Sequence, residues 1–175
     1  MVQNILESYA YTTLDNSNVF LQARACSVYK KYGRFDFQDH SHLLAATNKI
    51  SNLLKSDCIV VKVEAALAIS ELLNHQEVVD FIRPNLGNIL RIFLKIMDDV
   101  DYDDLIVALK DIVDKYGEEV APYAVSLCQK LSEAYLRLLQ AKGNCDDEDN
   151  ELGLTADGIL TAIRRILNSI SGRFP

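Results

Sequence analysis

The sequence predicts an all-α protein, a right-handed HEAT-repeat solenoid of about four antiparallel helix pairs. The chain is 49% hydrophobic but has only 7 glycines and 3 prolines in 175 residues, a composition that suits helices. A pattern of small and apolar residues at helical spacing also recurs along it, anchored on four alanines that lie 40, 43 and 54 residues apart: Ala25, Ala65, Ala108 and Ala162. Repeats of this length, each holding two helices, are typical of HEAT and armadillo solenoids.

The stretch from Ser56 to Leu73 shows the repeat most clearly. At about 100° per residue, its apolar residues cover two opposite helix faces and leave a narrow polar strip that holds Glu64, Glu71 and His75. A helix that is apolar on two faces must be packed on two sides, so we expect an inner helix of a stack. Asp57 is its expected N-cap.

In chain order, we expect one continuous domain over residues 1–175, with repeats at 3–33, 39–75, 77–117 and 118–172. The predicted helices cover residues 4–14, 19–32, 39–55, 58–73, 77–82, 84–97, 105–116, 123–142 and 155–171. Gly33 and Gly117 each follow a Lys-Tyr pair, and Gly33 is expected in the left-handed conformation that ends many helices. Pro84 breaks the third outer helix.

Apolar residues at the two ends of such a stack would have no further repeat to cover them. We therefore expect Ile5 and Tyr9 at one end, and Ile163, Ile166 and Ile170 at the other, to be partly exposed or covered by a neighbouring molecule.

Composition excludes several classes of function. The formal charge of −7 argues against nucleic acid as a direct ligand, because phosphate binding needs a basic surface. The sequence has no apolar run of 18 or more residues and no signal peptide, so no membrane association and an intracellular location are expected. Four cysteines occur without a CxxC pair, which predicts free thiols.

No catalytic, cofactor or metal site is predicted. His40 and His42 are two residues apart and point to different helix faces, so capping or exposed roles are favoured over metal binding. Cys26 lies among apolar positions and is expected to be a small buried residue, not a nucleophile. A GxSxG elbow and a glycine-rich phosphate loop are both missing from the sequence, so we do not expect an enzyme.

An acidic insertion over residues 143–153 is the strongest candidate for a functional element. It carries five carboxylates, which repel one another and stay solvated, yet suit Lys and Arg side chains of a partner: Asp146, Asp147, Glu148, Asp149 and Glu151. A purely solvated loop is the simpler alternative. A second acidic cluster, formed by Asp98, Asp99, Asp101, Asp103 and Asp104, is expected on the same edge of the solenoid and is a further candidate. Ordinary helix capping and compensation of the helix dipole are the favoured explanation for it.

The polar strips of the inner helices supply further candidate residues. The repeat register places Arg24 over Glu64 and Lys31 over Glu71, and we expect these two pairs to meet on the concave surface. The strip then becomes acidic in the later repeats. Its candidate protein-binding residues are Glu64, Glu71, Asp111 and Asp114.

Several ordered strings in the chain, LQARACSVY, VKVEAALAISELLNHQE, VVDFIRPNL, DDLIVALKDIVDKYGEEVAPYAVSL and TADGILTAI, resemble the middle of importin-beta-type nuclear transport receptors, nearest the importin seven and importin eight branch. The resemblance covers about residues 3–170. It implies an internal HEAT-repeat fragment of a longer receptor, with acidic insertions that touch Ran or basic cargo.

The implied function is Ran-dependent import of cargo proteins through nuclear pores. The implied partners are basic cargo proteins, Ran GTPase through the full-length parent, and nucleoporins or another importin, and the implied location is cytoplasm and nucleus, with shuttling between them. The alternative is a HEAT-repeat scaffold or adaptor outside nuclear transport, which would share the periodicity but not the quoted strings.

Overall fold

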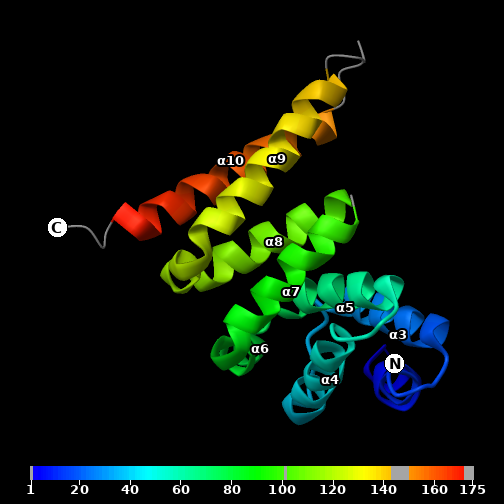
Figure 1. Ribbon diagram of the computed structural model, residues 1–175. Coiled ribbons are helices and arrows are strands. Elements are labelled where there is room, and N and C mark those ends of the chain that lie inside the picture. The colour runs from blue at the N-terminus through cyan, green and yellow to red at the C-terminus, as the bar shows by residue number, and fades with distance from the viewer. Residues whose placement is uncertain (1, 101, 143–149, 172–175) are drawn as a thin grey trace. The chain divides into compact units, whose positions relative to one another are not determined.

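The computed structural model describes residues 2–100, 102–142 and 150–171, which form helices joined by short turns (Figure 1). No β-strand occurs within these ranges, and the predicted all-α HEAT-repeat class is confirmed. The chain divides into two compact units, Met1–Ile96 and Met97–Pro175. A single continuous segment over residues 1–175 stays a prediction.

The first unit begins with one helical stretch that contains a π-helical turn, followed by well-formed helices. Its elements are α1 (Val2–Ile5), the π-helical η1 (Leu6–Ala10), α2 (Tyr11–Thr13), α3 (Val19–Tyr32), α4 (His40–Leu53), α5 (Ile59–Leu72), α6 (Gln76–Ile82), the 3-10 helix η2 (Arg83–Asn85) and the start of α7 (Leu86–Asp99). Pro84 lies in η2, where the chain leaves α6 and enters α7, as its missing N–H predicts.

Helix α5 is the core of the first unit. It packs along α3 and also against α4, and Figure 1 shows α3 and α5 side by side. Eight of its residues are buried, from both apolar faces: Val61, Ala65, Ala66, Leu67, Ala68, Ile69, Ser70 and Leu72. The predicted two-sided packing is confirmed, and the alanines allow the close approach of the neighbouring helix.

Helix N-termini in this unit are capped by short polar side chains at two of the three main helices. Asn18 accepts from the Phe20 N–H at the start of α3, and Asp39 accepts from Ser41 and His42 at the start of α4. The prediction for α5 was wrong, because its N-cap is Cys58, not Asp57, and Cys58 makes no side-chain cap.

The two glycines behave differently. Gly117 has φ of +50°, in the region that favours glycine, and ends α8. Gly33 has φ of −59°, so the predicted left-handed conformation was wrong. Its lack of a side chain serves packing instead, since a Cβ there would lie 2.7 Å from Cβ of Glu71.

The second unit contains α8 (Asp103–Tyr116), the 3-10 helix η3 (Gly117–Tyr123), α9 (Ala124–Lys142) and α10 (Asn150–Ser171). Helix α10 contacts α8, η3 and α9. This three-sided environment buries Ile166 completely, which corrects the expected partial exposure, whereas Ile163 and Ile170 are half-buried. In the first unit Ile5 and Tyr9 are 46% and 71% exposed, as expected.

Candidate protein-binding surface

Glu71 lies in the last turn of α5, where the turn after α3 reaches it. Arg34 Nε lies 2.8 Å from Glu71 Oε2, and His75 Nε2 hydrogen-bonds the Gly33 carbonyl at 2.7 Å. The predicted Lys31 partner was wrong: the Lys31 ammonium extends over the ring of Tyr32, 5.9 Å from its centroid. Close contact of Gly33 with α5 brings Arg34, not Lys31, to the carboxylate.

Glu64, one α5 strip residue, is half-buried, and its Oε2 is buried without a hydrogen-bond partner. The predicted ion pair with Arg24 was wrong, since Arg24 is exposed and no ion pair within 4 Å joins them in the part of the chain that the structure describes. The pKa of the Cys26 thiol on α3 is raised to about 12, mainly by burial and to a smaller extent by the charge of Glu64.

Asp111 and Asp114 lie on α8 beside basic side chains of their own unit. Lys110 Nζ is 3.3 Å from Asp114 Oδ2 and 3.6 Å from Asp111 Oδ1. Arg165 on α10 lies 2.7 Å from Asp114 Oδ1, an ion pair without the angles of a hydrogen bond. These two carboxylates are therefore partly neutralised within the chain.

These basic partners were not predicted from the sequence. The spacing of Lys110 and Asp114, four residues apart on one helix, is a signal that the sequence contains. Arg165 comes from a different helix, and Arg34 from a turn, so only the packing of the helices reveals their roles.

The cluster over residues 98–104 supplies both helix-end charges and an ion-pair network. Asp103 and Asp104 lie in the first turn of α8, where carboxylates favour the positive helix end. Asp98 pairs with Lys130 on α9, and Lys130 Nζ lies 3.1 Å from Glu133. Asp101 lies outside the described residues.

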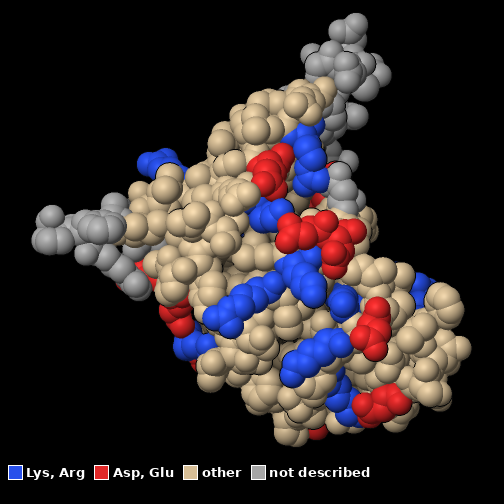
Figure 2. All heavy atoms as spheres, in the orientation of Figure 1, with Lys and Arg blue, Asp and Glu red and all other residues tan. Residues whose placement is uncertain are grey.

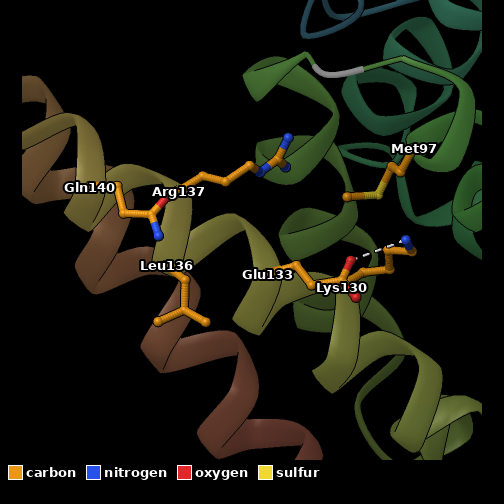
Figure 3. A pocket seen from close by; sticks show the side chains of 6 residues that line it. All are labelled: Met97, Lys130, Glu133, Leu136, Arg137 and Gln140. Carbon is orange, nitrogen blue, oxygen red and sulfur yellow. Dashed lines mark hydrogen bonds and ion pairs between the residues drawn. The ribbon is translucent and has the colours of Figure 1, made fainter.

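A hollow of about 390 Å³ opens beside this network (Figure 3). It is lined by Met97 and by α9 side chains, among which Leu136 is 57% exposed. Its lining combines apolar and charged side chains, and the hollow is open to solvent. Lys130 and Glu133 in its wall pair with each other, so they do not form a convergent set of polar groups for a ligand.

The acidic insertion lies outside the described residues. This applies to Asp146, Asp147, Glu148 and Asp149, and to the side chain of Glu151, whose backbone begins α10. Elsewhere, on the face shown in Figure 2, Lys and Arg side chains lie beside Asp and Glu side chains. Both signs of charge are thus present on this face.

The three histidines have structural partners. His40 Nδ1 pairs with Glu77, His42 Nε2 lies 3.3 Å from the Tyr29 hydroxyl, and His75 bonds Gly33. Within the described ranges, no group of three His, Cys, Asp or Glu side chains is arranged to hold a metal ion. The same ranges hold no helix that is both long and apolar enough to cross a membrane.

Comparison with known proteins shows what the chain is similar to. It is 30% identical over 99% of its length to a probable importin-7 homolog of Dictyostelium discoideum. It is 33% identical over 97% of its length to an importin beta-like SAD2 homolog of Arabidopsis thaliana, and 28% identical over 94% of its length to human importin-8. In each case it spans 16% of the relative. No family model and no solved structure matches.

Proposed function

We propose that this chain works as a segment of a nuclear import receptor. Nearly the whole chain is similar to importin-7, importin-8 and importin-beta-like proteins, and this similarity confirms the resemblance in its sequence. The observation that carries the proposal is the coverage: the relatives match 94% to 99% of this chain. A HEAT scaffold outside nuclear transport would share the helices but not this similarity.

In this proposal, basic segments of cargo proteins bind acidic residues of the chain. Charge complementarity would supply specificity and a fast association rate. Because Glu71, Asp111 and Asp114 have basic neighbours in their own units, a cargo must compete with Arg34, Lys110 and Arg165 there. The insertion over residues 143–153 is therefore the first candidate for cargo contact.

The remaining roles follow from the same proposal. Ran GTPase would act through the full-length receptor, nucleoporins or another importin would be further partners, and the receptor would shuttle between cytoplasm and nucleus. The segment would contribute binding surface and would have no catalytic activity.

A cargo-release experiment tests the proposal. The full receptor that contains this segment is immobilised, loaded with proteins captured from a nuclear extract, and treated with Ran bound to GTP or to GDP. A transport receptor should release its cargo with the GTP form only, whereas equal retention with both forms would support the scaffold alternative.

The role of the insertion is tested in the same assay. Replacing Asp146, Asp147, Glu148 and Asp149 by Asn or Gln should weaken capture of basic cargo, most clearly at low salt. The control replaces Asp98, Asp99, Asp103 and Asp104 in the same way, which removes equal charge elsewhere. Equal losses in both variants would indicate a general charge effect and no specific site.

A further inference from the structure

A second surface of the first unit has the opposite chemistry. A narrow groove of about 120 Å³ lies between α4 on one side and α6, η2 and α7 on the other. Asn48, Ser51, Asn52 and Lys55 line it from the α4 side, and Asn85 and Asn88 from the other. All of these residues belong to Met1–Ile96, so the groove is contained in one unit.

The walls of the groove contain no carboxylate. Residues 40–56 and 81–97 lack Asp and Glu entirely, although the chain as a whole has 25 acidic residues in 175. Lys55 lines the groove, and Lys95 lies on the same exposed face of α7 as Asn88, two helical turns farther on. On the face shown in Figure 2, Lys and Arg side chains extend over α4 and α7.

The two acidic residues of α6 are already paired. Glu77 on α6 pairs with His40, and Asp80 lies 2.5 Å from Arg83. Neither lines the groove. Asp98 and Asp99 follow at the end of α7 and do not line the groove, so Lys55 is the one charged side chain among its lining residues.

The groove also has unused hydrogen-bonding capacity. Each asparagine side chain offers two donors and an acceptor, and within the described residues the side-chain amides of Asn48, Asn52, Asn85 and Asn88 make no hydrogen bond. Ser51 Oγ is buried in the wall and has no hydrogen-bond partner.

Apolar side chains complete the lining. Ile89 and Ile92 contribute from α7, and Phe81, which is 41% exposed, contributes from α6. An extended peptide presents backbone N–H and C=O groups along its length and alternates its side chains between two sides. Amides on both walls can hydrogen-bond such a backbone, and the apolar lining can receive an apolar side chain.

We propose that this groove binds an extended acidic segment of a partner protein. The asparagine amides hold the peptide backbone, alternate apolar side chains enter between α4 and α7, and the carboxylates face Lys55 and Lys95. A nucleic acid is disfavoured because the groove is narrow and partly apolar and the chain has a net charge of −7. This site is independent of the acidic residues proposed for basic cargo.

Fluorescence anisotropy of the full chain with a labelled peptide in which glutamate alternates with valine tests the inference. We expect saturable binding, and weaker binding of the same peptide with glutamine in place of glutamate. The variant N52D/N88D places two carboxylates in the groove and should weaken binding of the glutamate peptide by about tenfold or more. Lys55→Gln should weaken it by a smaller factor.

Matched variants separate the site from general charge effects. N4D/N16D adds two carboxylates at exposed positions outside the groove, and Lys31→Gln removes an exposed cation outside it. Both should leave binding unchanged, and circular dichroism should show every variant folded. Equal losses for groove and control variants, or equal binding of the glutamate and glutamine peptides, would overturn the proposal. So would tighter binding of a labelled single-stranded RNA that N52D/N88D also abolishes.

Discussion

Gly33 packs directly against Glu71, so that a Cβ at position 33 would lie 2.7 Å from Cβ of Glu71 and 2.9 Å from the carbonyl oxygen of Tyr29. Backbone conformation does not require glycine there, because φ is −59°. The requirement is steric, and it holds the end of α3 against the end of α5. The same contact places Arg34 beside the Glu71 carboxylate.

Gly33→Ala should therefore destabilise the protein by about 1 to 3 kcal/mol, the usual cost of overpacking. Urea unfolding followed by circular dichroism measures the change. Gly158→Ala in α10 is the control: its Cβ would meet only the flexible end of Lys110, at 3.3 Å, and alanine should stabilise a helix interior by about 0.5 to 1 kcal/mol. If Gly33→Ala is as stable as the wild type, the contact is not as tight as described.

Acid should remove the stabilisation from one helix cap. Asp39 accepts from the Ser41 hydroxyl and from the N–H groups of His42 and Ser41, and these bonds hold the pKa of Asp39 below its usual value. A lowered pKa means that the stabilisation is present above about pH 4 and is lost as the pH falls through the folded-state value. Asp39→Ala should thus lower the melting temperature at pH 7, and by less in acid.

Asn caps a helix about as well as Asp and does not titrate. Asp39→Asn should therefore stay close to the wild type at pH 7 and gain on it as the pH falls below about 4. Melting curves of the wild type and both variants across this pH range provide the measurement. A constant difference between wild type and Asp39→Ala at every pH would show that the carboxylate charge is not what stabilises α4.

The helices could be predicted from the sequence because their apolar spacing is strong, and α3 and α5 match the predicted residues 19–32 and the core of 56–73 closely. It predicted Gly33 wrongly because a glycine after Lys-Tyr has two uses, a left-handed turn or a close helix contact, that look alike in the sequence. The predicted ion pairs of Glu64 and Glu71 were wrong for a related reason. Repeat register aligns positions along neighbouring helices, but the Arg34 pair arises in a turn that no helical register describes.

Cysteine reactivity should follow burial. Cys26 is fully buried with a pKa raised to about 12, whereas Cys58 and Cys128 are half-buried. Alkylation in native buffer, read by peptide mass spectrometry, should modify Cys58 well before Cys26, and denaturant should remove the difference. Burial raises the pKa of Cys26 more than the charge of Glu64 does. The alkylation of Cys26 should therefore stay slow in the variant Glu64→Gln. Rapid native labelling of Cys26 would contradict its position in the core.

The ion pair between Asp114 and Arg165 should contribute modestly to stability. Their side chains are 25% and 53% exposed, so solvent screens the pair. A double-mutant cycle with Asp114→Asn and Arg165→Gln should give a coupling free energy of about 0.2 to 1 kcal/mol that decreases at high salt. No coupling at low salt would show that the two side chains do not interact in solution.

The same pair offers a direct test of the acidic strip as a binding surface for basic segments. If Asp114 attracts a partner, Arg165→Gln should strengthen binding of a labelled Lys- and Arg-rich peptide, because it removes the competing guanidinium 2.7 Å from Asp114 Oδ1. Arg164→Gln is the matched control, since Arg164 is the neighbouring exposed residue of α10 and its loss changes the net charge equally. A gain for Arg165→Gln that exceeds the gain for Arg164→Gln, and that Asp114→Asn cancels, would place the peptide at Asp114. Equal gains would reflect net charge alone and would remove Asp114 from the proposed cargo surface.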